Sequence, residues 1–517
     1  MKDTKSKWII AILSFVFFIV VWNKNQWFDS YAFVVDAREG VDIVHPHHLF
    51  YNLFRYLLYH FSSFIGIDQF RFLSGVSSVF GAASLALVYS IIKKATSDSF
   101  KSLIGVLAIA GLFGFWFYSS SVEVNITSVF FLLLAINSIS GGKHNRKQTA
   151  VTFLWLTIGV LFHQILGMAV IVFLLYEMYR YGSVTEPLKP ASISLIPGFI
   201  IYSVVGFFYA ETKSIPGLLK WFTAYAHYGR WGILSLDNFA NSASGTIKAI
   251  FGGTSLRTIL FVDEITFSGY LYLFLISLIL LGMLLLTIFS IRSYFRKEDK
   301  TNLLIILLFV VFLIFAFWWA PNDDGFWLYP LILAVMFVIS NLNMNKITKP
   351  VTVTIVVMLL GLNLFCEIIP NSRDKNSIAS SSSTALSKLN FAESDLIITN
   401  MLHLALAHNY YSGVKVKFGS IALQESGTFE EMASALRDKI NECEGRIFIF
   451  ENEMKPEPHR RFLYDLISAE QYDQFYNQLR PDLIVRDSVL IYAKFVKIYE
   501  LNRNQPDESN PETSLNQ

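Results

Sequence analysis

Cysteine and charge are both scarce in this chain. Only two cysteines, Cys366 and Cys443, occur among its 517 residues. They cannot form a disulfide framework, and we expect both thiols to be free, with a single bridge between them as the alternative. Only 16% of the residues are charged while 53% are hydrophobic, a composition too apolar for a soluble protein of this size. The composition therefore predicts a polytopic α-helical membrane protein.

Several other features are missing as well. The formal net charge is only +2 and no basic patch stands out, so we expect no nucleic-acid partner. The sequence has no internal repeat, no glycine-rich phosphate loop and no cysteine–histidine spacing typical of zinc sites. No small-residue cleavage site follows the first apolar run, at 8–22, which predicts an uncleaved anchor in place of a signal peptide.

Apolar runs near the length that crosses a ~30 Å hydrocarbon core recur along most of the chain. Together with the run at 8–22 they predict about eleven transmembrane helices in a domain spanning 1–367. His163 and Gln164 fall at the turn between two short runs, which could be half-length or tilted helices that meet within the outer half of the membrane. The further runs lie at 70–92, 103–118, 126–139, 151–162, 165–179, 192–209, 267–291, 302–319, 326–339 and 351–366.

Lysine and arginine in the connecting loops set the expected orientation. Basic loops alternate with loops rich in acids and aromatics, which places the N-terminus in the cytoplasm and the C-terminus outside. We expect the inner membrane of a bacterium rather than the endoplasmic reticulum. The basic inner loops are 93–101, 141–148, 179–189, 291–300 and 341–349. The outer loops, named loops one to four, are 23–64, 119–125, 210–266 and 320–326.

The composition changes to that of a water-soluble fold after the last apolar run. A polar linker at 368–390 leads to a small extracytoplasmic α/β domain at 391–501, followed by a polar tail at 502–517 that we expect to be disordered. Within the domain, short apolar runs predict two buried strands and a single terminal strand, with an amphipathic helix between strands. The strands are predicted at 395–400, 446–452 and 489–499, and the helix at 428–442.

Loop one concentrates acids and imidazoles where the membrane meets water. The segment after them, 49–64, is apolar around most of its circumference, with Arg55 and His60 as its few polar residues. This pattern is typical of a helix lying at the interface. The charged and imidazole residues of the loop are Asp29, Asp36, Arg38, Glu39, Asp42, His45, His47 and His48.

The spacing of two dipeptides in loop one resembles a known pattern. Asp29-Ser30 is followed by His45-Pro46, sixteen residues after the aspartate. This order resembles the D-S … H-P pattern of the O-mannosyltransferase-like branch of the GT-C glycosyltransferase superfamily. The layout also resembles that superfamily, with Glu123 in loop two, His163 at the short helical pair and a soluble module after the last span. The residues that follow Pro46 depart from the branch, which usually has Pro or Gly there.

The resemblance implies a GT-C-like fold and a hexosyl- or mannosyltransferase-like activity. Such enzymes move a sugar from a polyprenyl-phosphate carrier to an acceptor hydroxyl at the outer membrane face. An inverting transfer needs a carboxylate that takes the proton of the acceptor hydroxyl while the carrier phosphate leaves from the opposite face. By its position in the family pattern, Asp29 inherits the role of general base or metal ligand. Asp36 and Glu123 are the further catalytic candidates, and each of the three could instead be a solvated or structural acid.

The imidazoles of loop one and of the helical pair are candidates for contact with the carrier phosphate. His45, His47, His48 and His163 could donate hydrogen bonds or partial positive charge to it. Alternatively, Pro46 opens the interfacial helix and the histidines are polar caps at headgroup depth. No cofactor is certain; a divalent metal remains an option. Its weak candidate ligands would be Asp29, His45 and His48.

Loop three places cations among aromatic residues. Lys220, Arg230 and Arg257 lie in this loop, and Arg230 is the first choice because arginine can hold a phosphate with two hydrogen bonds. The alternative is an aromatic belt with snorkelling basic side chains. Loop four is dense in acids and aromatics, which would either stack on sugar faces or anchor helix ends.

Two other classes of function remain open. One is a transporter or flippase for a lipid-linked sugar, although ionisable groups gather at one surface here and are rare in the middle of the spans. The other is a non-catalytic protein of envelope-glycan assembly whose outer domain binds a partner. The expected partners are a polyprenyl-phosphate-linked sugar donor, an acceptor that is a protein, a lipid or a glycan, and the bilayer.

Overall fold

A computed structural model describes the chain at residues 2–140, 145–209, 212, 214–223, 232–253, 255, 259, 265–295, 300–373, 383, 386–399, 402–420, 429–454, 469–491 and 494–502. These residues form two compact units. The first unit comprises residues 2–24 and the described residues from 36 to 373, and the second comprises residues 25–35 and the described residues from 383 onward. Helix α2 (Phe28–Glu39) contributes residues to both units.

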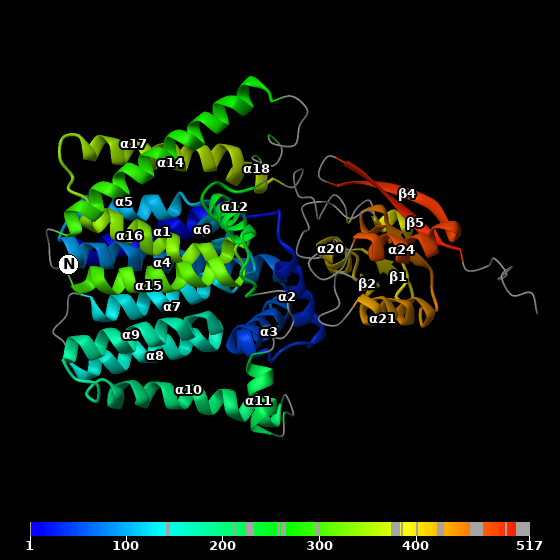
Figure 1. The fold of residues 1–517 in the computed structure, drawn as a ribbon, viewed down its shortest axis with the longest axis horizontal. Coiled ribbons are helices and arrows are strands. Elements are labelled where there is room, and N and C mark those ends of the chain that lie inside the picture. The colour runs from blue at the N-terminus through cyan, green and yellow to red at the C-terminus, as the bar shows by residue number, and fades with distance from the viewer. Residues whose placement is uncertain are drawn as a thin grey trace, which may run out of the picture. The chain divides into compact units, whose positions relative to one another are not determined.

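The first unit is a bundle of helices. Figure 1 shows its long helices running roughly side by side, including α4, α7, α8, α9 and α10. Two one-turn 3-10 helices, η1 (Pro46–His48) and η2 (Gln164–Leu166), lie before α3 and α9 respectively. The helices are α1 (Lys2–Val20), α3 (Leu49–Phe64), α4 (Gln69–Thr96), α5 (Ser99–Ala110), α6 (Phe113–Ser119), α7 (Asn125–Ile139), α8 (Arg146–Phe162), α9 (Gly167–Tyr181), α10 (Leu188–Phe208), α11 (Ile215–Phe222), α12 (Asp237–Phe251), α14 (Phe267–Tyr294), α15 (Lys300–Trp319), α16 (Asp324–Asn341), α17 (Thr348–Asn363) and α18 (Ile369–Asn371).

Several of these helices are long and apolar enough to cross a membrane. Among the described residues there are six, or seven if the bent pair α5 and α6 counts as one span. The six are α4, α10, α14, α15, α16 and the continuous helix from α17 to α18. The prediction of about eleven spans also counted α1 and shorter helices such as α7 and α9, each of 15 residues, so that number stays a prediction.

The run predicted at 103–118 is not one straight helix. It forms α5 and α6, which are bent by 75° relative to each other. The Asn363 side chain donates to the carbonyl oxygens of Gly111, at the break, and of Ile250, each at 2.6 Å. A helix break leaves backbone carbonyls without helical partners, and in a membrane these must be satisfied by protein. Asn363 supplies that hydrogen bond from a distant helix.

Helix α4 lies at the centre of the first unit, packed against α1, α5, α6 and α7. Its approach to the end of α6 depends on Gly81, where a Cβ atom would lie only 2.2 Å from the Ser119 hydroxyl oxygen. The neighbouring Ser78 hydroxyl donates to the carbonyl oxygen of Ser119 at 2.8 Å. This close contact fixes the start of loop two against the core.

The second unit is built on a five-stranded sheet in the order β2-β1-β3-β5-β4. Strand β1 pairs in parallel with β2 and β3, while β5 pairs antiparallel with β3 and β4. Alternate strand residues pack on opposite faces, Ile398 in one buried cluster and Ile397 in the other, as the period of two requires. The elements are β1 (Leu396–Ile398), α20 (Leu402–Ser412), β2 (Lys417–Gly419), α21 (Phe429–Asn441), β3 (Ile447–Phe450), α22 (Glu451–Met454), α24 (Ala469–Leu479), β4 (Leu483–Ile491) and β5 (Lys494–Leu501).

The prediction of a single terminal strand at 489–499 is wrong. That run belongs to two antiparallel strands, β4 and β5, and β2 was not predicted at all. Strands β1 and β3 and helix α21 lie where the sequence predicts them. The last helix continues to Asn371, so that it includes the first four residues of the predicted linker at 368–390. Apart from Asn502, the predicted tail lies outside the described residues.

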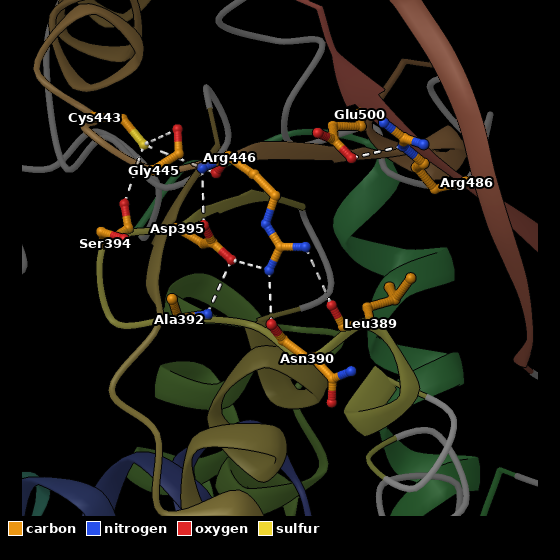
Figure 2. A network of polar contacts seen from close by, with 10 residues as sticks. All are labelled: Leu389, Asn390, Ala392, Ser394, Asp395, Cys443, Gly445, Arg446, Arg486 and Glu500. Carbon is orange, nitrogen blue, oxygen red and sulfur yellow. Dashed lines mark hydrogen bonds and ion pairs between the residues drawn. The ribbon is translucent and has the colours of Figure 1, made fainter.

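An ion pair between a buried aspartate and a partly exposed arginine lies at the start of the inner strands β1 and β3. Asp395 is 2% exposed and accepts a hydrogen bond of 2.7 Å from the Arg446 side chain and one of 2.8 Å from the Arg446 backbone N–H. Figure 2 shows the same guanidinium group reaching the carbonyl oxygens of Leu389 and Asn390. Burial raises the pKa of Asp395, but these hydrogen bonds outweigh it and bring the pKa below its usual value. The network ties the segment before β1 to the start of β3.

Candidate active site

Helix α2 carries both aspartates that the sequence singled out in loop one. Asp29 lies in its first turn and Asp36 two turns later. Seven residues in an α-helix bring side chains back to nearly the same face, about 10 Å apart along the axis. Asp29 belongs to the second unit and Asp36 to the first. In the second unit, Tyr31 is buried and its ring lies 6.4 and 6.3 Å from the rings of Tyr410 and Tyr411.

Both aspartates have a raised pKa. The Asp29 side chain is exposed, but the protein packed around its carboxyl group partly desolvates it and raises its pKa to about 6. Asp36 is half-buried, and burial raises its pKa to about 6 against the opposing charge of Arg55. A carboxylate with such a pKa is ionised at neutral pH and basic enough to take a proton.

Arg55 is the site residue that sequence reasoning missed. From the sequence, Arg55 was expected to be one of the few polar residues on a helix lying at the membrane interface. In the structure its side chain is only 1% exposed. Its charge acts on Asp36 and on Asp42, and it also acts on His48 of η1. The sequence signal that could have identified Arg55 was its position as a single arginine on an otherwise apolar helix. An arginine that is buried on such a helix needs acidic partners close by.

A tight turn brings the acidic stretch back over α3. The Asn52 side chain donates to the carbonyl oxygen of Asp42 at 2.7 Å and to its carboxylate at 3.3 Å. Asp42 adopts a left-handed backbone conformation with φ of 47°, which aspartate tolerates better than most residues. The backbone N–H of Val41 donates to the carbonyl oxygen of Asp36 at 3.1 Å. These bonds hold the end of α2 and the turn after it against the helix that carries Arg55.

Four histidines from two segments form a cluster in the first unit. The ring of His48 lies 5.8 Å from that of His45 and 4.8 Å from that of His163, and the rings of His45 and His47 are 5.3 Å apart. The Tyr202 hydroxyl lies 3.1 Å from the carbonyl oxygens of both Pro46 and Val160. It thereby ties η1 to the end of α8, directly before His163.

Burial favours the uncharged form of three of these imidazoles, those of His47, His48 and His163. Burial lowers the pKa of His163 to about 3. Burial, with the charges of His45 and His163, lowers the pKa of His47 to about 3. The pKa of His48 lies well below its usual value, first because of burial and then because of its neighbours, which include Arg55. These three imidazoles can therefore offer neutral hydrogen-bond donors and acceptors, but little positive charge.

The described residues offer no support for a metal site. No group of three or more His, Cys, Asp or Glu side chains among them could hold a metal ion. Of the three predicted ligands, Asp29 lies in the second unit while His45 and His48 lie in the first. The possible divalent metal stays a prediction.

Loops two and four meet in the first unit around Tyr118. Its hydroxyl donates to the Asp324 carboxylate at 3.2 Å, and it also interacts electrostatically with Glu123 and Asp323. Glu123 and Asp324 are each only 4% exposed. Lys248 donates to loop four through the side chain of Asn322 at 2.7 Å. The arrangement gathers three acids from two loops, one of which is the predicted catalytic candidate Glu123.

Loop three is only partly described. Arg230 and Arg257 lie outside the described residues, whereas Lys220 is exposed on α11. Helix α11 lies against η1, and the backbone carbonyl of Phe222 at its end accepts a hydrogen bond of 3.1 Å from Gln164, the residue after His163. The structure therefore brings the end of α11 to the histidine cluster.

Comparisons with known proteins give a fold but no close relative. No family model and no curated protein matches the chain. The apo structure of ArnT from Cupriavidus metallidurans matches with a TM-score of 0.57 at 11% identity, over 97% of this chain and 98% of that one. The structure of the same protein bound to undecaprenyl phosphate matches with a TM-score of 0.55 at 10% identity, over 95% of this chain and 97% of that one. An oligosaccharyltransferase from Archaeoglobus fulgidus, in the apo form, matches with a TM-score of 0.47 at 10% identity, over 86% of this chain and 69% of that one.

The match to ArnT extends over nearly the whole of both chains and includes the described helices that are long enough to span a membrane. The predicted membrane class is confirmed at this level. The chain is an integral membrane protein with the fold of ArnT.

Proposed function

We propose that the protein is an inverting glycosyltransferase that moves a sugar from a polyprenyl-phosphate carrier to an acceptor hydroxyl at the outer membrane face. The observation that carries the proposal is the fold match to ArnT over 97% of the chain. One of the matching structures holds undecaprenyl phosphate, which supports a lipid carrier of the same class for this chain. The acceptor would be a lipid, a protein or a glycan.

Asp29 is the proposed general base and Asp36 the second acidic group of the site. Each has a pKa of about 6, which suits a base that must be ionised at neutral pH and still accept a proton. As the acceptor oxygen attacks the anomeric carbon, the base takes its proton, the bond to the carrier oxygen breaks and the phosphate leaves with the electron pair. Glu123, buried beside Tyr118, would orient the acceptor from loop two.

The carrier phosphate would be held by the histidine cluster and by the basic residues of loop three. His45, His47, His48 and His163 lie together in the first unit. Among the basic residues, Lys220 lies on α11, which contacts η1; Arg230 and Arg257 complete the proposed set. The order Asp29-Ser30 followed by His45-Pro46 supports a hexose donor of the O-mannosyltransferase-like branch.

Replacing each acid by its amide tests the proposal. Asp29→Asn and Asp36→Asn should each lower the rate of sugar transfer by about 10²–10⁴-fold, because an amide cannot take the proton. The measurement is transfer from a radiolabelled polyprenyl-phosphate sugar by purified protein, with the amount of protein in the membrane checked for each variant.

Glu39→Gln is the matched control, because Glu39 lies on the same helix and pairs with Arg38 at 3.2 Å. It should keep nearly full transfer activity. A flippase or a non-catalytic assembly protein would show no transfer in the wild type. Full activity of Asp29→Asn would rule out the proposed base.

A further inference from the structure

Two short helical turns in the first unit are built on the same pattern. A histidine occupies the N-cap of η1 and another occupies the N-cap of η2. In η1, the backbone N–H of His47 donates to Nδ1 of His45 at 3.3 Å. In η2, the backbone N–H of Ile165 donates to Nδ1 of His163 at 3.2 Å. The two turns contact each other.

The capping bonds fix the tautomer of both imidazoles. A neutral imidazole has one N–H donor and one acceptor nitrogen, and the tautomer is set by the bond that the other nitrogen makes. Because Nδ1 accepts a backbone N–H in both residues, Nδ1 carries no proton. The ring proton of the neutral form must then be on Nε2. Each capping histidine therefore presents an Nε2–H group as a donor.

We infer that His45 and His163 are a pair of neutral, tautomer-locked donors that bind the oxygens of a phosphate monoester or diester through Nε2–H. The inference rests on the proposed function and assigns the phosphate-binding role to one nitrogen of each ring. The phosphate is that of the carrier lipid before and after the sugar leaves.

Three observations support an anion as the ligand of these donors. The guanidinium group of Arg55 acts electrostatically on His48, whose ring lies 4.8 Å from that of His163. A ring nitrogen that carries a proton has no lone pair for a metal ion. Burial keeps His163 uncharged, so its bond to phosphate is that of a neutral donor to an anion, a strong class of hydrogen bond.

Asparagine and glutamine separate the two ring nitrogens of His163. The asparagine side-chain oxygen can stand in for Nδ1 and cap η2, but asparagine has no donor at the position of Nε2. The glutamine amide reaches the position of Nε2 and can donate a hydrogen bond there. It cannot replace Nδ1 as the acceptor that caps η2. His163→Asn should therefore fold like the wild type and bind undecaprenyl phosphate about 10–100-fold more weakly. His163→Gln should keep most of the affinity and lower the thermal midpoint by about 2 °C.

The same pair of changes at His45 provides an independent test in η1. His60→Asn is the matched control, because His60 is an exposed histidine on α3, and it should change neither affinity nor stability. Binding is measured on the full chain in lipid nanodiscs, with undecaprenyl phosphate, undecaprenol and inorganic phosphate as separate ligands. Undecaprenol binding should be equal in all variants, since it lacks the anion. Inorganic phosphate should show the same order of variants as the lipid at lower affinity.

The outcomes distinguish this inference from the proposed function. If the wild type does not bind undecaprenyl phosphate, the carrier class in the proposed function is wrong. If the wild type binds undecaprenyl phosphate and the asparagine variants bind it equally well, the inference of tautomer-locked donors is refuted. It is also refuted if asparagine and glutamine reduce binding equally at both sites. Selective ¹⁵N labelling of histidine gives a second readout, because it reports which ring nitrogen carries the proton. Protonation at Nδ1 of His163 would overturn the inference.

Discussion

Arg55 is a buried positive charge that acts electrostatically on both an acid and an imidazole. Burial of Asp36 raises its pKa, and the charge of Arg55 works against that rise. The same charge helps to keep His48 unprotonated. A single residue thereby favours the ionised form of the proposed acid and the neutral form of the histidine at the same pH.

Removing that charge should move the pH dependence of sugar transfer. Asp36 is ionised above its pKa of about 6, so activity should fall as the pH drops through that value. In Arg55→Met the opposing charge is gone, so the pKa of Asp36 rises further. The fall of activity on the acid side of the pH profile, its acid limb, should then move to higher pH by roughly one unit. The measurement is kcat/KM against pH.

Arg71→Met is the control for this shift. Arg71 is an exposed arginine on α4 and its guanidinium group lies 5.1 Å from the ring centroid of Trp22, so its loss should leave the limb in place. An unchanged limb in Arg55→Met would show that Arg55 does not control the ionisation that limits the rate.

The sequence could point to individual site residues but not to how they meet. The dense run from His45 to His48 is visible in the sequence, and the turn between two short apolar runs marks His163. Their contact depends on the packing of η1 against η2, which no local pattern encodes. Arg55 was missed because burial depends on what packs against a helix, and here α3 packs against α4 and α8.

At the scale of elements, the hydropathy pattern predicted the long apolar helices but not the bend between α5 and α6. The run at 103–118 reads as one span because apolar character continues through the break at Gly111. The bend is stabilised by Asn363, whose amide reaches Gly111 and Ile250. That contact joins segments far apart in the chain, so a window of neighbouring residues cannot reveal it.

Asn363→Leu should destabilise the first unit. The change removes two buried hydrogen bonds and leaves two backbone carbonyls without the donor, at about 1–3 kcal/mol for each buried group. We expect a loss of roughly 2–4 kcal/mol, seen as a lower midpoint in thermal unfolding of the purified protein in detergent. Asn343→Leu, at an exposed asparagine before α17, should have little effect. Equal midpoints in the two variants would show that Asn363 does not hold the bend.

The second unit shows where the strand pattern failed. The run at 489–499 contains no glycine, proline or asparagine, the residues that usually mark a turn between strands. It was therefore predicted as one strand, although it spans parts of β4 and β5. Strands β1 and β3 were found because both are short, fully buried apolar runs. Burial on both faces gives a stronger sequence signal than a hairpin without turn residues.

For the whole molecule, composition predicted the membrane class, and the match to ArnT confirms it at the level of fold. The number of spans could not be obtained in the same way. Helices such as α7 and α9 are only 15 residues long, and hydropathy alone does not tell a short span from a buried helix. The expected orientation, with the N-terminus inside and the C-terminal domain outside, depends on the basic loops and can be tested directly.

Cysteine labelling tests the orientation of the whole chain, because the protein has only two cysteines and they form no disulfide with each other in the structure. In a Cys366→Ser, Cys443→Ser background, Glu444→Cys reports on the second unit and Lys346→Cys on the predicted inner loop at 341–349; both positions are exposed. A maleimide that cannot cross membranes should label Glu444→Cys in intact spheroplasts and Lys346→Cys only after permeabilisation. The predicted asymmetry follows from the retention of lysine and arginine on the cytoplasmic side. The reverse pattern would place loops one to four in the cytoplasm, where a site for a carrier exposed at the outer face could not operate.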